Sequence, residues 1–154
     1  REKVTTKREV PLWRGRLDRD QFGQLPGFPG MWTLEIGSGT SPAKRLYTHI
    51  LTSDVLPLEH LDFVFDCHEI DHFTEIPDAS LDVVTLTNVL HHLRDPILFM
   101  NKVASKIKPG GRVIATEPYF SALSAFFWRY FHHEPVVFSI DERTLSESEA
   151  PRSP

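Results

Sequence analysis

A glycine–serine–glycine turn at residues 37–39 is the first feature with a chemical use, because it directly follows the apolar, β-branched stretch Thr33–Ile36. Pro42 and a run of alternating charged and apolar residues come after the turn, which predicts a helix start. A strand, a glycine turn and a helix start in this order bring backbone N–H groups to the carboxyl end of a sheet, where a nucleotide-like ligand can bind. Glycine lets the backbone approach such a ligand closely and adopt positive φ.

An acidic residue follows at the spacing typical of nucleotide-binding units. Residues 50–54 read as a second short strand that ends in Asp54, close to the offset of about 20 residues at which a carboxylate meets ribose hydroxyls. A carboxylate can accept hydrogen bonds from both hydroxyls of a vicinal diol. We therefore expect Asp54 to bind a ribose, with a solvated turn aspartate as the alternative.

Three more strands are expected further along the chain, at residues 61–65, 81–87 and 112–116. Strands that alternate with helices predict an α/β fold with a Rossmann-like doubly wound sheet of five parallel strands, covered on both faces. Right-handed crossovers then bring the carboxyl ends of all strands to one edge. One ligand site is expected there, formed by residues scattered in the sequence: Gly37, Asp54, Asp66, Asn88 and Glu117.

One helix has clear boundaries in the sequence. Asp95 is an N-cap candidate with Pro96 at the first helical position, and Pro109–Gly111 is the expected stop. The apolar face is expected from residues spaced by three and four: Ile97, Met100, Ala104 and Ile107.

Composition predicts one soluble domain. The 154 residues carry a net charge of -4, which argues against a broad nucleic-acid-binding surface, and the single cysteine suits a reducing cytoplasm. No apolar run approaches the ~20 residues of a membrane span. We expect an N-terminal arm and loop over residues 1–30, a ligand-binding domain over 31–140 and a polar, disordered tail over 141–154.

Together these motifs resemble the class I S-adenosylmethionine-dependent methyltransferases of the small-molecule type. The resemblance runs from about residue 33 to residue 118 and rests on LEIGSG, FDCHEI, LDVVTLTNVLHHL and IKPGGRVIATEP. It implies S-adenosylmethionine as cofactor and methyl transfer to a small or mid-sized acceptor. It also implies a set of cofactor-binding residues: Glu35, Gly37, Ser38, Gly39, Asp54, Val55, Asp66, Cys67 and Asn88.

The resemblance implies a role for each of these residues. The glycine turn would hold the methionine and ribose part, and Glu35 would orient the methionine amine. Val55 would lie against the adenine face, while Asp66 and the Cys67 N–H would meet the adenine amino group and a ring nitrogen. Asn88 would face the sulfonium end.

Two other functions stay open. A nicotinamide-dependent oxidoreductase would need a third glycine where Pro42 stands, because that position allows close helix–strand packing around a pyrophosphate. A non-catalytic module of the same fold, acting through a partner, is favoured by the lack of recognisable strands after Glu117. The domain is therefore expected to be C-terminally shortened or a fragment, and residues 112–116 to form an open sheet edge. Residues 136–139 would cover this edge, or a homodimer would form through it.

The histidines and a late aromatic segment supply the remaining candidates. His91 or His92 could act as a general base, since imidazole titrates near neutral pH; packing and helix capping are the alternative roles. No metal is expected, because neither a pair of cysteines nor an H-E-x-x-H helix is present. Residues 121–133 are expected to form an aromatic helix that covers the acceptor pocket or a partner, with substrate contacts from Tyr119, Trp128 and His132.

Overall fold

The computed structural model describes residues 16, 19–20, 22–23, 25–40 and 43–118. Most of the expected N-terminal arm, the aromatic helix, the 136–139 segment and the polar tail lie outside these residues. So do the three candidate substrate contacts, Tyr119, Trp128 and His132. The predictions for them stay predictions.

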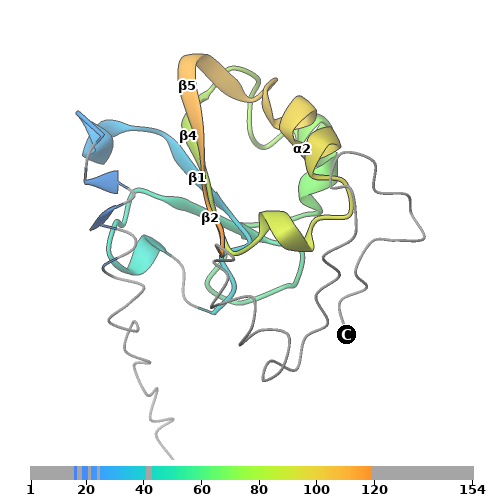
Figure 1. Ribbon diagram of the computed structural model, residues 1–154, viewed down its shortest axis with the longest axis horizontal. Coiled ribbons are helices and arrows are strands. Elements are labelled where there is room, and N and C mark those ends of the chain that lie inside the picture. The colour runs from blue at the N-terminus through green and yellow to red at the C-terminus, as the bar shows by residue number, and fades with distance from the viewer. Residues whose placement is uncertain (1–15, 17–18, 21, 24, 41–42, 119–154) are drawn as a thin grey trace, which may run out of the picture.

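Five parallel strands form one sheet in the order β3-β2-β1-β4-β5 (Figure 1). The strands are β1 (Thr33–Ile36), β2 (Leu51–Asp54), β3 (Phe63–Val64), β4 (Leu81–Thr87) and β5 (Ile107–Thr116). This confirms the Rossmann-like doubly wound fold. The strand order reverses between β1 and β4, and in open α/β sheets ligands bind at the carboxyl ends beside such a reversal.

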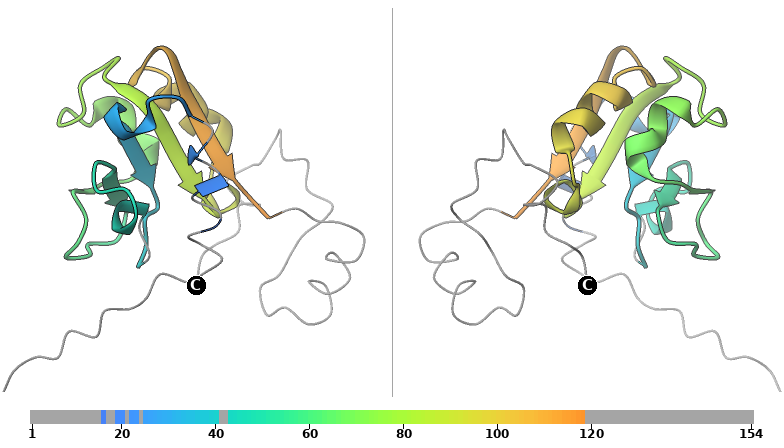
Figure 2. Two further views of the ribbon diagram at one scale, coloured as in Figure 1. Left: turned by 90° about the vertical axis from the view of Figure 1, so that its left-hand side faces the viewer. Right: turned by 90° about the vertical axis from the view of Figure 1, so that its right-hand side faces the viewer.

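Short helices lie on both sides of the sheet, which Figure 1 shows edge-on and Figure 2 from two sides. They are the 3-10 helices η1 (Phe28–Gly30), η2 (Ala43–Arg45), η3 (Cys67–His72) and η4 (Leu90–His92) and the α-helix α2 (Pro96–Val103). Helices α2 and η3 pack against each other on one face of the sheet, and η1 and η2 lie on the other. None of the described helices is long and apolar enough to cross a membrane.

The two faces of the sheet differ in polarity because neighbouring parallel strands place residues of the same register on one face. Leu34 lies beside Leu51 and Val84, and this apolar face packs on α2. Glu35 lies in the next register, beside Thr52 and Thr85. All three of these polar residues are buried, so the sheet carries a buried polar face on the side of η2.

The predicted face of α2 is wrong, although its start is confirmed. Asp95 caps the helix by accepting a hydrogen bond from Leu98 N at 2.8 Å. The buried residues are Phe99 and Val103, whereas Ile97, on the predicted face, is 57% exposed. The helix has eight residues and ends before the expected stop, because the chain enters β5 at Ile107. A helix this short contacts the sheet through one i, i+4 pair, here Phe99 and Val103. Several residues of the segment have spacings of three and four, so spacing alone does not identify the buried pair.

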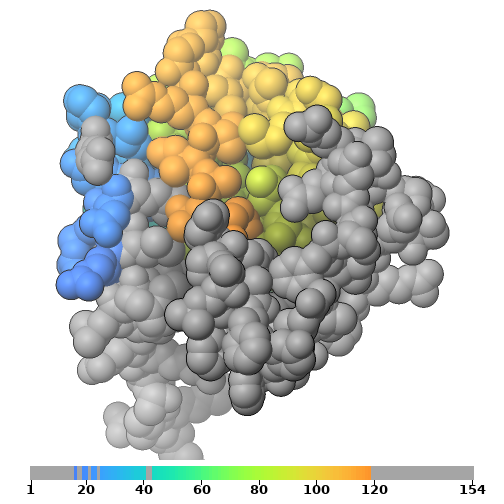
Figure 3. All heavy atoms as spheres, in the orientation of Figure 1, coloured from blue at the N-terminus to red at the C-terminus, as the bar shows by residue number. Residues whose placement is uncertain are grey.

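Strand β5 forms the edge of the described sheet. It pairs with β4, and among the residues that the structure describes none pairs with its other side. Figure 3 shows β5 and α2 side by side on the surface of the molecule. The homodimer expected through this edge stays a prediction.

Candidate functional site

The turn after β1 meets the turn after β4. Gly37 has φ 67° and Gly39 has φ 51°, so both adopt the left-handed conformation that favours glycine. A Cβ on Gly37 would lie 2.4 Å from Val89 Cγ2, and only a residue without a side chain allows this approach. The backbone therefore brings the β1 turn and the segment after Asn88 together at the carboxyl edge of the sheet.

Glu35 supports the glycine turn from within the protein. Its side chain is buried, and Oε2 accepts hydrogen bonds from Ser38 Oγ at 3.0 Å and from Ala43 N at 2.9 Å. The same carboxylate thus ties the turn to the start of η2. Contact with a methionine amine stays a prediction for Glu35, and its observed role is to fix the shape of the turn.

Asp54 connects the glycine turn to the loop after β2. Its Oδ2 accepts from Gly39 N at 2.9 Å and its Oδ1 from Leu56 N at 3.0 Å. Each carboxylate oxygen has two acceptor lone pairs, so both retain capacity for a diol. The exposed Val55 follows directly, and His60 Nε2 lies 2.8 Å from Gly39 O. Asp54 is therefore held directly beside the glycine turn, and its contact with a ribose stays a prediction.

Asp66 and Cys67 lie at the end of β3, where η3 begins. Asp66 caps η3 by accepting from His68 N at 2.9 Å, and His68 Nδ1 also lies 2.9 Å from the same oxygen. Burial raises the pKa of Asp66, but these hydrogen bonds outweigh it and hold the pKa below its ordinary value of 3.8. Burial, with the charges of Asp66 and Asp54, raises the pKa of Cys67 to about 12. The Cys67 thiol therefore stays protonated, which favours a role for its backbone rather than its sulfur.

The Asp66, Cys67 and His68 side chains have ligand atoms within 4.8 Å of one another, as a metal site would need. Both ring nitrogens of His68 are engaged within the protein, however. Its Nδ1 faces the Asp66 carboxylate, and Asp95 N donates to Nε2 at 3.3 Å. The hydrogen bonds of His68 therefore connect the start of η3 with the segment before α2, which is a structural role.

Glu117, directly after β5, holds the turn after β4. Its Oε1 accepts from Val89 N at 3.0 Å and Leu90 N at 2.8 Å, and its Oε2 forms a short hydrogen bond with His91 Nδ1. The rings of His91 and His92 lie 4.0 Å apart, and both residues are exposed. His91, one of the two candidate bases, thus has a carboxylate partner.

Asn88 begins this turn with φ 56°, an uncommon value for a residue other than glycine. Its N–H donates to Thr116 O at 2.9 Å, which extends the β4–β5 pairing by one residue, and its side chain is exposed. Asparagine adopts positive φ more readily than most residues other than glycine, and such conformations cluster at functional sites. The orientation of Asn88 toward a sulfonium stays a prediction.

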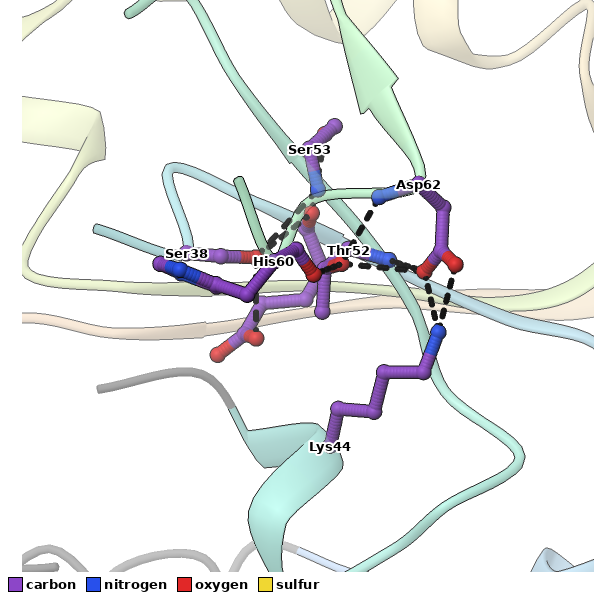
Figure 4. Close-up of polar contacts among 7 residues, drawn as sticks. Ser38, Lys44, Thr52, Ser53, His60 and Asp62 are labelled. Atoms are coloured by element: carbon purple, nitrogen blue, oxygen red, sulfur yellow. Dashed lines mark hydrogen bonds and ion pairs between the residues drawn. The ribbon is translucent and has the colours of Figure 1, made fainter. Parts of the chain in front are cut away.

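Sequence reasoning missed a polar network beneath the loop after β2. Asp62 accepts hydrogen bonds from Lys44 Nζ at 2.6 Å, from Thr52 N at 2.8 Å and from Thr52 Oγ1 at 2.9 Å (Figure 4). Lys44 reaches Asp62 from η2, so the network joins η2, β2 and the loop that carries His60. No local motif marks it, because the ion pair links residues that only the folded chain brings together.

The Asp62 network should make stability depend on acid pH. Burial raises the pKa of Asp62, but hydrogen bonds from Lys44 and Thr52 outweigh it, so the folded pKa lies below the ordinary 3.8. The carboxylate therefore stabilises the fold above about pH 3.8, and this contribution is lost as the pH falls through the folded pKa.

We expect Asp62→Asn to lower the free energy of unfolding at neutral pH and to lose less stability than the wild type below about pH 4. Urea unfolding measured across the acid range checks this. If the free energy of unfolding of the two proteins depended on pH in the same way, Asp62 would not be the group responsible.

Comparison with known proteins gives a consistent result. The profile of a family described as a methyltransferase domain matches residues 15–148. A methyltransferase of Claviceps purpurea is 30% identical over 115 residues, which cover 66% of this chain and 33% of the relative. The ubiquinone biosynthesis O-methyltransferase of Ruegeria pomeroyi is 28% identical over 116 residues, which cover 66% of this chain and 46% of the relative.

A solved structure agrees on the fold. The carbon methyltransferase CurJ superposes with a TM-score of 0.50 at 21% identity, over 65% of this chain and 32% of its own. At that identity the likeness concerns the fold alone. The chain spans a third to just under half of the length of the curated relatives.

Proposed function

Since the chain belongs to the class I S-adenosylmethionine-dependent methyltransferase family, we propose that it binds this cofactor at the carboxyl edge of its sheet and transfers a methyl group to a small or mid-sized acceptor. The observation that carries the proposal is the hydrogen-bonded chain from Glu35 through the glycine turn to Asp54. These hydrogen bonds hold the glycine turn and the Asp54 carboxylate next to each other.

The residues present fit the cofactor. A ligand without a pyrophosphate does not need a three-glycine phosphate cradle, so Pro42 is no obstacle. The Asp54 carboxylate has acceptor capacity for the ribose hydroxyls, and the exposed Val55 offers an apolar surface for adenine. When bound, S-adenosylmethionine would supply an electrophilic methyl group on a positively charged sulfur. The protein then has to place the acceptor in line with that methyl, and placement alone can supply much of the rate.

Calorimetric titration of the full 154-residue chain tests which cofactor it binds. We expect S-adenosylhomocysteine, the demethylated cofactor, to bind and NADH not to bind. Binding of NADH alone would favour an oxidoreductase. Binding of neither ligand would favour the non-catalytic module and overturn the proposal.

Asp54→Ala tests the site within this function. The variant removes a charged hydrogen-bond acceptor, a loss of roughly 1.5–3 kcal/mol, so the affinity for S-adenosylhomocysteine should fall about tenfold or more. Calorimetry gives the dissociation constants.

Glu59→Ala serves as a matched control, because it removes an exposed carboxylate from the same loop. An unchanged dissociation constant in Asp54→Ala, or an equal loss in Glu59→Ala, would remove Asp54 from the site.

A further inference from the structure

We propose that Glu117 is a positioning residue that sets His91 as the base for a hydroxyl acceptor. The inference rests on the proposed function and adds the class of acceptor to it. Three hydrogen-bond donors converge on the Glu117 carboxylate: the Val89 and Leu90 amides and His91 Nδ1. The first two fix the turn, and the third fixes the ring that the turn carries.

The carboxylate determines which nitrogen of His91 carries the proton. A carboxylate only accepts hydrogen bonds, so the neutral imidazole must carry its proton on Nδ1, where it faces Glu117. Nε2 is then the nitrogen with a lone pair. The His91 side chain is 41% exposed, so its ring is open to an acceptor.

The turn that holds His91 is also the turn that touches the cofactor side of the site. Val89, two residues before His91, lies against Gly37 closely enough to exclude a Cβ there. Because Glu117 binds the Val89 amide, one side chain holds both the glycine-turn contact and the base. His91 therefore belongs to the same short turn whose Val89 contacts the segment proposed to hold the methionine end of the cofactor.

Methyl transfer to an acceptor with an O–H group accounts for every bond and for the proton. The acceptor oxygen forms a bond to the methyl carbon while the carbon–sulfur bond breaks, and the O–H proton goes to His91 Nε2. The products are a methyl ether, S-adenosylhomocysteine and an imidazolium whose charge Glu117 neutralises. A base is useful only where the acceptor must lose a proton, and phenolic hydroxyls, with a pKa near 10, lose it far more readily than alkyl alcohols. Base catalysis by His91 thus favours phenolic or enolic acceptors.

Glu117→Gln separates this role from a purely structural one. The amide oxygen can still accept from Val89 N and Leu90 N, so the turn can keep its shape. The amide N–H₂ would then face His91 Nδ1 and donate to it, which moves the ring proton to Nε2. Nε2 can no longer accept a proton, as when a histidine base is held in the wrong tautomer.

The experiment uses the full chain with three measurements on wild type, Glu117→Gln and the control Glu69→Gln. Glu69 is exposed and lies 3.8 Å from Lys102, so its variant removes a similar charge that does not contact the Glu117 carboxylate cluster. Nitrogen-15 NMR at a pH where the ring is neutral reports the His91 tautomer, assigned by loss of its signal in His91→Gln. Calorimetry reports affinity for S-adenosylhomocysteine, and methyl transfer is assayed with catechol as the phenolic probe.

We expect the Nδ1–H tautomer in wild type and control, and the Nε2–H tautomer in Glu117→Gln. The rate with catechol should fall ~10²–10⁴-fold in Glu117→Gln, with cofactor affinity within about twofold. The same tautomer in both proteins, or an unchanged rate, overturns the role of Glu117. Wild type that binds S-adenosylhomocysteine but leaves catechol unmethylated overturns the hydroxyl assignment. If wild type does not bind S-adenosylhomocysteine, the proposed function is overturned. The tautomer measurement still tests whether Glu117 positions the His91 ring.

Discussion

Gly37→Ala should lower the affinity for S-adenosylhomocysteine by at least about tenfold and the free energy of unfolding by about 2–4 kcal/mol. The new Cβ would lie 2.4 Å from Val89 Cγ2 and 3.1 Å from Cγ1. Rotating the β-branched valine does not relieve the contact, because both methyl groups lie on that side and χ1 is restricted. Either the glycine turn or the turn after β4 must move, and both belong to the proposed site.

Gly39→Ala is the matched control. Gly39 also has positive φ, at 51°, but a Cβ there would meet no atom within 4 Å. Its cost should therefore be limited to the left-handed backbone strain, about 1–2 kcal/mol. Urea unfolding and calorimetry on both variants check the difference. Equal effects on stability and binding would show that the Val89 contact is unimportant.

The strands could be predicted from the sequence because each has a signal along its own residues. β1 and β4 match their expected bounds, since a parallel strand buried on both faces is a short apolar or β-branched run between turn signals. The cap at Asp95 is equally local, because the N-cap, Pro96 and the capped amide lie within four residues. The parallel direction of the strands could then be predicted from the alternation of strands and helices and from right-handed crossovers.

The contacts that shape the site could not be predicted, because they depend on which strand ends are neighbours. Glu117 meets Val89 and Leu90 across 28 and 27 residues of sequence only because β5 lies beside β4. The available signal was a carboxylate directly after a strand, next to a turn that contains histidines. That signal predicted that these residues lie at one edge of the sheet, but it did not predict which residues they contact. Asp62 and Lys44 had no such signal, since Asp62 precedes its strand.

Phe99→Ala should lower the free energy of unfolding by about 3–5 kcal/mol. Phe99 is 0% exposed and belongs to the core between α2 and the apolar face of the sheet. Truncation would leave a cavity that the parallel strands, fixed by their pairing, cannot collapse to fill. Urea unfolding gives the measurement.

Ile97→Ala is the control that decides between the two faces of α2. The sequence spacing places Ile97 in the core, whereas the structure leaves it 57% exposed. Ile97→Ala should therefore change stability by no more than about 0.5 kcal/mol, because surface substitutions rarely exceed that and alanine favours the helix slightly more than isoleucine. A large loss in Ile97→Ala with a small one in Phe99→Ala would mean that α2 is rotated about its axis. Glu117 and His91 would be unaffected by such a rotation, because β5 and the turn after β4 hold them without any contact from α2 among the hydrogen bonds described.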